Sequence, residues 1–425
     1  MLNANFYLSK IIEALIISVL IAFAASPLSI RIAHKLGVID NPGEARRVHK
    51  KPIPRFGGMA IMLGSMAAMF IPAGMNDKIR IAMVGGLMMY ILGALDDMFD
   101  LKASVKFIAQ AAIASLVYAL GIRITFISNF FGAAVTDAHA NVILSTGVGF
   151  IITVFWIVGI TNAVNLMDGL DGLAAGSVAI MSFSLAYVAY IHGARIGSMP
   201  VCIALVAVAG GCIGFLPFNF SPAKTFMGDG GALYLGYMIA VLSVISPLKQ
   251  ATVVGALIPM LTLAVPIFDT SLAMLRRALK HEPIMSADKG HLHHHLMAAG
   301  FGQRRSVLIM YGIVGIMGEV AVLISRELYK DAVPLFMIAL LYLGIIIVPK
   351  RPKKGLKTII TQDVSEMEKE NFVEYLNYER QRRKELRELA ADKAKEEEKD
   401  GEGSETTLDV DRDIEEYIQK LEAKE

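Results

Sequence analysis

Residues 146–172 read TGVGFIITVFWIVGITNAVNLMDGLDG, an apolar run that ends directly in amides, acids and glycines. The run is long enough to cross a membrane as a helix, because a hydrocarbon core of about 30 Å needs about 20 mostly apolar residues. The polar residues then lie where the helix reaches the membrane surface. Other apolar runs of the chain also end in aspartates, so this arrangement predicts both the fold and the place of the chemistry.

The composition is that of a membrane protein. Of the 425 residues, 55% are hydrophobic and 19% are charged, and the mean hydropathy is +0.53. Soluble proteins are typically about 45–50% apolar and about 25% charged, so an ordinary soluble globule is excluded. Disorder over most of the chain is also excluded, because disordered segments lack apolar residues. Cys202 and Cys212 are the only cysteines, so no disulfide framework and no cysteine-based zinc site is expected.

We predict an all-α polytopic membrane protein with about eleven transmembrane helices. The apolar segments lie at roughly 10–30, 56–74, 80–95, 104–121, 144–160, 173–192, 199–216, 231–247, 251–270, 306–325 and 332–348. The first segment could also be a cleaved signal peptide, but its length favours a membrane span. The less apolar stretch 122–143 is expected to be an external loop with a small strand or a re-entrant element.

Lysines and arginines accumulate in alternate loops. They follow the first, ninth and last apolar segments, within 31–55, 276–305 and 350–357, whereas the other loops hold isolated charges. The positive-inside rule places the basic loops in the cytoplasm. The N-terminus is then outside and the C-terminus cytoplasmic, which agrees with an odd number of spans.

Residues 350–425 differ from the rest of the chain because charged residues crowd into them. We therefore predict a transmembrane catalytic domain over 1–349 and a charged cytoplasmic tail over 350–425, which is helical by its apolar spacing. The tail is either a solvated charged helix or a helix that docks on a cytoplasmic partner or on itself.

The aspartates of the apolar region all follow spans at the predicted cytoplasmic side. They are Asp96, Asp97, Asp100, Asp168, Asp171, Asp229 and Asp269. Each alone could be a helix cap or a solvated loop acid, but acids at the membrane edge mark functional sites by default. Clustered carboxylates without cysteines indicate a hard cation, which we expect to be Mg²⁺, with Mn²⁺ as an alternative. Asn162 and Asn165 can add neutral oxygen ligands or hydrogen bonds.

Two basic segments could hold phosphate at the same surface. His291, His293 and His294 belong to a histidine string that is a polyphosphate or nucleotide clamp, a zinc site, or a solvated basic loop. The loop 40–58, which contains Lys51, is a phosphate site or plain positive-inside charge. In both cases we favour the phosphate interpretation.

Mg²⁺, phosphate groups and a site open to lipid indicate phosphoryl transfer, with a lipid-linked phosphate as acceptor. Two other classes of protein are the alternatives. A transporter would place its acids near the membrane midplane and use broken helices. A receptor or scaffold would not need this constellation of aspartates, asparagines and histidines.

The same residues resemble the polyprenyl-phosphate N-acetylhexosamine-1-phosphate transferase family (glycosyltransferase family 4). The matching motifs, in order, are Asp96–Asp100, Asn162–Gly172, Phe226–Asp229, Pro266–Thr270 and His291–Leu296. One branch of this family transfers GlcNAc-1-phosphate to undecaprenyl phosphate, and the other transfers phospho-MurNAc-pentapeptide for peptidoglycan. The loop 40–58, the Asp269-Thr270 pair and the histidine string are similar to the first branch. The tail lies outside the resemblance.

The resemblance implies a Mg²⁺-dependent phosphoglycosyltransferase of the bacterial plasma membrane with its site on the cytoplasmic face. It would join GlcNAc-1-phosphate from UDP-GlcNAc to undecaprenyl phosphate and release UMP, as the first membrane step of a cell-envelope polysaccharide or teichoic acid pathway. Transfer of phospho-MurNAc-pentapeptide is the alternative. A homodimer is expected, and no nucleic-acid partner.

The resemblance also implies residue roles. Asp96, Asp97 and Asp229 would be catalytic, with Asp96 or Asp97 as base beside the lipid phosphate. Asp229 would be the leading metal ligand, with Asp97 and Asn165. The residues expected to bind substrate are Lys51, Asn162, Asp168, Asp171, Phe226, Asp269, Arg277, His291, His293 and His294.

Two mechanisms remain open for this transfer. Either the lipid phosphate attacks the donor directly, or an aspartate first forms a covalent intermediate. The direct route is favoured because an ionised phosphate is already a nucleophile and Mg²⁺ can neutralise both phosphates.

Overall fold

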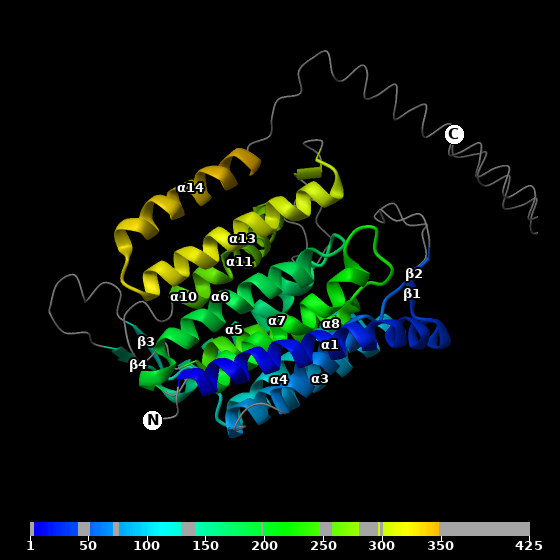
Figure 1. Cartoon of the computed structure of the whole chain (residues 1–425), viewed down its shortest axis with the longest axis horizontal. Coiled ribbons are helices and arrows are strands. Elements are labelled where there is room, and N and C mark those ends of the chain that lie inside the picture. Colours follow the sequence, from blue (N-terminus) through cyan, green and yellow to red (C-terminus); the bar gives the residue numbers. More distant parts are fainter. Residues whose placement is uncertain are drawn as a thin grey trace, which may run out of the picture. The chain divides into compact units, whose positions relative to one another are not determined.

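The computed structural model describes residues 4–40, 52–70, 76–128, 141–196, 199–246, 257–279, 296–297 and 301–347. These residues form mainly long helices, with two small antiparallel sheets (Figure 1). The predicted tail over 350–425 and the domain boundary before it lie outside these residues and stay predictions.

A helix lies at each of the apolar segments that the sequence indicates. The helices are α1 (Ala4–Leu36), α2 (Gly58–Phe70), α3 (Asp77–Phe99), α4 (Ala103–Ala119), α5 (Thr146–Met167), α6 (Leu173–Ile196), α7 (Met199–Asn219), α8 (Gly228–Ile245), α10 (Leu257–Thr262), α11 (Ala264–Leu279), α13 (Gln303–Ser325) and α14 (Tyr329–Ile347).

Within the described residues, 7 helices are long and apolar enough to cross a membrane: α1, α3, α5, α6, α7, α8 and α13. The helices α2 and α4 are apolar but shorter. The chain is therefore a helical, multi-pass membrane protein, as predicted. The count of about eleven crossings and the orientation stay predictions.

The predicted ninth span, 251–270, is not one continuous helix in the described residues. It is divided into α10 and α11, and α11 continues to Leu279. Pro266 explains the break, because it has no N–H for the carbonyl of Thr262 and its ring collides with that carbonyl in a continuous helix. Proline is tolerated in the first turn of α11, where its missing N–H has no intrahelical partner.

Each of the two sheets is a pair of short strands. Strand β1 (Ile39–Asp40) pairs with β2 (Ile53–Pro54), and β3 (Phe126–Ser128) pairs with β4 (Asn141–Ile143). The second pair confirms the small strand expected within or next to 122–143. The first pair closes the loop between α1 and α2 and sets the direction of the chain that enters α2.

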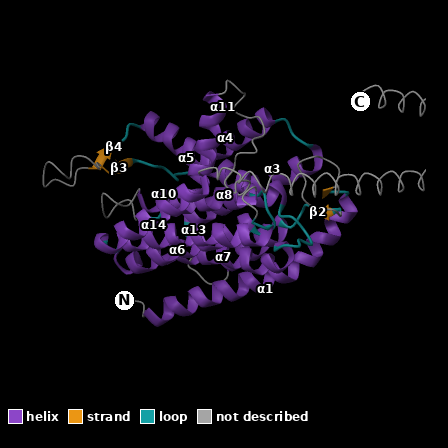
Figure 2. Ribbon diagram, turned by 90° about the horizontal axis from the view of Figure 1, so that it is seen from above, coloured by secondary structure: helices purple, strands orange, loops and turns teal. Residues whose placement is uncertain are grey.

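Helix α8 is the central helix of the bundle. It contacts α2, α3, α5 and α7, and Figures 1 and 2 show it enclosed by its neighbours. Its aromatic residues Tyr234 and Tyr237 are fully buried, and the Tyr234 hydroxyl lies 2.6 Å from the Ser65 hydroxyl of α2. A helix that is apolar on all sides is stable only when it is surrounded. The start of α8 is thereby fixed against α2 and α3.

Candidate active site

The site forms where α3 and α5 end and where α4 and α8 begin. The loop before α8 is joined to the loop before α2 by backbone hydrogen bonds. Phe226 donates its N–H to the Pro54 carbonyl at 2.8 Å and accepts from the Gly57 N–H at 2.9 Å, and Gly58 donates to Met227 at 2.8 Å. These bonds hold residues 54–58, which lead into α2, beside the start of α8, although the two segments are far apart in sequence.

Asp97 lies in the wall of the site, with its side chain only 1% exposed. One carboxylate oxygen accepts from the Gly230 N–H at 3.1 Å, in the first turn of α8. The other oxygen lies 3.2 Å from the Arg55 guanidinium and forms no hydrogen bond in the described structure. Asp97 therefore keeps one buried oxygen whose hydrogen-bonding capacity is unused.

Lys106 of α4 connects two of the predicted catalytic aspartates. Its ammonium lies 2.5 Å from Asp96 Oδ2 and 2.6 Å from Asp229 Oδ2. The other oxygen of Asp229 accepts from the Asn165 amide at 2.8 Å. Lys106 of α4 and Asn165 of α5 thus contact Asp229 of α8 directly, and Asp96 of α3 joins them through Lys106. This is the convergence that the predicted single site requires.

Arg55 and Asp168 show that negative charge dominates this part of the site. Burial opposes the charge of Arg55, but Asp97, Asp229, Asp40 and Asp168 outweigh it and raise its pKa above the usual value. Burial raises the pKa of Asp168 to about 7, and the neighbouring charge of Asp229 contributes to the increase. A bound cation would offset the negative charge that helps to raise the pKa values of Arg55 and Asp168.

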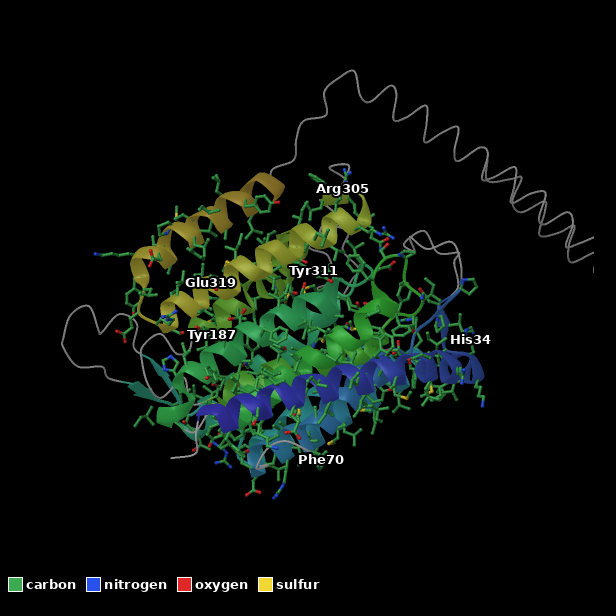
Figure 3. All side chains as sticks on the ribbon, viewed as in Figure 1. His34, Phe70, Tyr187, Arg305, Tyr311 and Glu319 are labelled. Atoms are coloured by element: carbon green, nitrogen blue, oxygen red, sulfur yellow. The ribbon has the colours of Figure 1, made fainter. Side chains whose placement is uncertain are left out.

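A second group of bonds holds the loop that follows α5. Asn219 accepts from the Gly172 N–H at 3.1 Å and donates to the Thr225 carbonyl at 3.0 Å. Asp171 accepts from the Ala223 N–H at 3.1 Å. Tyr311 of α13, which Figure 3 labels, donates to the Gly172 carbonyl at 2.5 Å. Asp171 therefore takes part in holding two site loops together.

The structure places the remaining predicted residues as follows. Asn162 exchanges hydrogen bonds with Gln110 of α4, at 2.6 and 3.4 Å, instead of contacting Asp229 directly. Phe226 lies in the loop before α8, and Asp269 is partly buried on α11, which contacts α5. The side chain of Arg277 and residues Lys51, His291, His293 and His294 lie outside the described residues. Their binding roles stay predictions.

Two site residues were missed by the sequence analysis. Lys106 lies inside the predicted span 104–121, and a lysine in an apolar run is itself a signal of function. Arg55 belongs to the basic loop, but nothing in the sequence distinguishes it from its basic neighbours. Only the fold shows that it faces Asp97.

The donor set fits a magnesium ion. The unused oxygen of Asp97, the carboxylate of Asp229 and the amide oxygen of Asn165 are hard oxygen ligands. No group of three or more histidines, cysteines or acids suited to hold a metal occurs among the described residues. Mg²⁺ commonly uses one or two carboxylates and completes its shell with water and substrate phosphates, so these residues are compatible with the expected ion, whose binding stays a prediction.

Comparison with known proteins identifies relatives over most of the chain. The profile of "Glycosyl transferase family 4" matches residues 79–247. The "Probable undecaprenyl-phosphate N-acetylglucosaminyl 1-phosphate transferase" of Bacillus subtilis is 39% identical, over 75% of this chain and 86% of the relative. The "Decaprenyl-phosphate N-acetylglucosaminephosphotransferase" of Mycobacterium tuberculosis is 35% identical, over 69% of this chain and 77% of the relative.

A relative from the second branch is more distant. The "Phospho-N-acetylmuramoyl-pentapeptide-transferase" of Desulforudis audaxviator is 30% identical, over 70% of this chain and 92% of the relative. The matched profile includes Asp96, Asp97, Lys106, Asn165 and Asp229, which the fold brings together. The chain belongs to the polyprenyl-phosphate N-acetylhexosamine-1-phosphate transferases of glycosyl transferase family 4.

Proposed function

We propose that this protein transfers GlcNAc-1-phosphate from UDP-GlcNAc to undecaprenyl phosphate and releases UMP. The observation that carries the proposal is the group formed by Asp96, Asp97, Asp229 and Lys106 at one end of the helix bundle. The name of the Bacillus subtilis relative supports the choice of sugar and lipid. The product would begin a cell-envelope polysaccharide or teichoic acid.

The transfer is a direct displacement at phosphorus. An oxygen of the lipid phosphate forms a bond to the phosphorus that carries the sugar. The bond from this phosphorus to the bridging oxygen breaks, and UMP leaves with the bonding electrons. Asp97 is the better candidate for the base that takes a proton from the lipid phosphate, because it lies beside Arg55, whose guanidinium can hold that phosphate. Asp96 is already engaged by Lys106.

Arg55 supports this assignment. Its guanidinium lies next to Asp97, and its side chain is 34% exposed. A guanidinium in this place can contact a phosphate oxygen while it orients the carboxylate. Direct displacement is preferred to a covalent aspartyl intermediate, because the ionised lipid phosphate is already a nucleophile.

Asp229, Asp97 and Asn165 would hold the expected Mg²⁺, with Mn²⁺ as an alternative. When bound, the ion would neutralise charge on the diphosphate and on the leaving group. The chain's own residues position the carboxylates, and Gly230 fixes Asp97 through its N–H. Asp229→Asn is expected to abolish UMP release. Near-normal release from this variant would contradict the assignment of Asp229.

The membrane arrangement is part of the proposal. About eleven spans, an external N-terminus and a cytoplasmic C-terminus are the proposed arrangement, in which the site would lie at the cytoplasmic face of the plasma membrane. The basic loops and the donor UDP-GlcNAc, a cytoplasmic metabolite class, support this orientation. A homodimer and a cytoplasmic partner for the tail remain proposals of the same kind.

The test is UMP release by the purified, detergent-solubilised protein with undecaprenyl phosphate and Mg²⁺. UDP-GlcNAc and UDP-MurNAc-pentapeptide are compared side by side, because a relative of 30% identity bears the name of the second activity. Turnover with UDP-GlcNAc alone is expected. Turnover with only the pentapeptide donor would contradict the proposal, as would the absence of UMP with either donor.

A further inference from the structure

Lys106 occupies the position that a cation is expected to take. Its ammonium lies between carboxylates of two different helices, 2.5 Å from Asp96 Oδ2 and 2.6 Å from Asp229 Oδ2. The side chain is only 18% exposed. A partly buried ammonium with two carboxylate partners is strongly held, because few water molecules compete with those contacts.

The same contact limits access to Asp229. One oxygen of Asp229 accepts from Asn165 at 2.8 Å, and the other accepts from Lys106 at 2.6 Å. Mg²⁺ binds carboxylate oxygens at about 2.0–2.1 Å. A divalent ion ligated by Asp229 would therefore lie close to the ammonium, and two positive charges at that separation repel each other.

The neighbouring cation is arranged differently. Arg55 approaches Asp97 at 3.2 Å, and one oxygen of that carboxylate forms no hydrogen bond. Arg55 thus pairs with Asp97 without a hydrogen bond, whereas Lys106 donates a hydrogen bond to Asp229 at 2.6 Å and is held more closely. Of the two cations, Lys106 is therefore the one that restricts the access of a metal ion to its carboxylate partner.

We propose that Lys106 is the built-in counter-ion of the metal site and competes with the divalent ion for Asp229. Metal binding then requires the ammonium to withdraw from Asp229. The inference rests on the proposed function, since it assumes that Asp229 is a metal ligand. It predicts that loss of Lys106 strengthens metal binding even though the protein loses a residue of the site.

The experiment measures Mn²⁺ binding to the full-length protein in detergent, from the EPR signal of free Mn²⁺. Lys106→Met is expected to bind Mn²⁺ about tenfold more tightly than the unmodified protein, or better. Lys106→Gln, which keeps a hydrogen-bond donor without the charge, should behave like the methionine variant. Lys106→Arg keeps the charge and should stay close to the unmodified protein.

Lys102→Met is the matched control. Lys102 is an exposed lysine just before α4, and its replacement should leave Mn²⁺ affinity unchanged. The fold of each variant can be followed by the emission of Trp156, the single tryptophan, whose indole N–H donates to Ser243 of α8 at 3.1 Å.

The outcomes separate the two proposals. If the unmodified protein binds Mn²⁺ and both neutral variants bind it no more tightly, the counter-ion role is wrong and the metal site stands. If Asp229→Asn binds Mn²⁺ as well as the unmodified protein does, Asp229 is not a ligand and both proposals fail. Weaker binding by a folded Lys106→Met would also overturn the inference, because it would make Lys106 a support of the metal site.

Discussion

At the scale of single residues, the site depends on carboxylates that the fold holds close together in a partly buried place. Replacing Arg55 tests how much its positive charge beside Asp97 contributes to UMP release. Arg55→Met leaves the buried carboxylate of Asp97 without its paired cation, and removing one partner of a buried ion pair is costly because the other charge stays uncompensated. We expect kcat/KM for UMP release to fall roughly ten- to a hundredfold. Arg55→Lys should recover part of the activity, since lysine keeps the charge but not the planar fork.

The control for Arg55 is Arg80→Met. Arg80 pairs with Asp77 at 2.9 Å, but its side chain is 61% exposed and lies at the opposite end of α3. Exposed pairs of this kind contribute little, so neither activity nor stability should change. Equal losses in the Arg55 and Arg80 variants would show that the effect is not local to Asp97.

At the scale of elements, the site requires α3 and α8 to approach closely, and Gly93 makes this possible. A β-carbon at Gly93 would overlap the carbonyl of Asp229 and the amide of Gly230. Gly93→Ala should therefore displace the start of α8, lower stability by about 1–3 kcal/mol and nearly abolish UMP release. The melting temperature of the purified protein and its UMP release are the measurements.

Gly159→Ala is the matched control for Gly93→Ala. Gly159 lies within α5, and a β-carbon there would meet nothing within 4 Å. Alanine favours a helix over glycine by about 1 kcal/mol, so this variant should be at least as stable as the unmodified protein and fully active. A comparable loss in both variants would mean that helix interiors, and not the contact of α3 with α8, respond to the substitution.

The loop that carries Asp168 depends on α13. Tyr311→Phe removes one hydrogen bond to the Gly172 carbonyl, which is worth about 1 kcal/mol. The loop should then be less well positioned, so KM for UDP-GlcNAc should rise severalfold while the protein stays folded. Tyr342→Phe, at an exposed tyrosine of α14, should leave KM unchanged. An unchanged KM in Tyr311→Phe would show that α13 does not contribute to binding of the donor.

At the scale of the whole molecule, the sequence predicts the helices better than the contacts between them. Apolar runs indicate helices wherever the structure has them, because each run must satisfy its own backbone within the membrane. The aspartates were predicted to meet, and Asp96, Asp97 and Asp229 do. The Asn162–Gln110 pair was not predicted, since the spacing along α4 and α5 does not say which faces meet. The break between α10 and α11 was predictable, because a proline such as Pro266 disfavours a continuous helix.

Membrane orientation is a property of the whole chain, and α4 offers a direct test of it. Lys102 precedes this helix and Arg123 follows it, and both are exposed. A helix of 17 residues is about 26 Å long, so we expect the two positions near opposite membrane surfaces if α4 is a span, as predicted. The native Cys202 and Cys212 are buried in α7, so an introduced cysteine should provide most of the labelling signal.

With intact cells, a membrane-impermeant maleimide is expected to label Arg123→Cys. Lys102→Cys should be labelled only after the membrane is permeabilised, because it lies on the side of Asp96, Lys106 and Asp229. The variant without an added cysteine gives the background. The reverse pattern would place the carboxylates outside the cell, away from cytoplasmic nucleotide sugars. The proposed donor would then be excluded whatever the chemistry of the site allows.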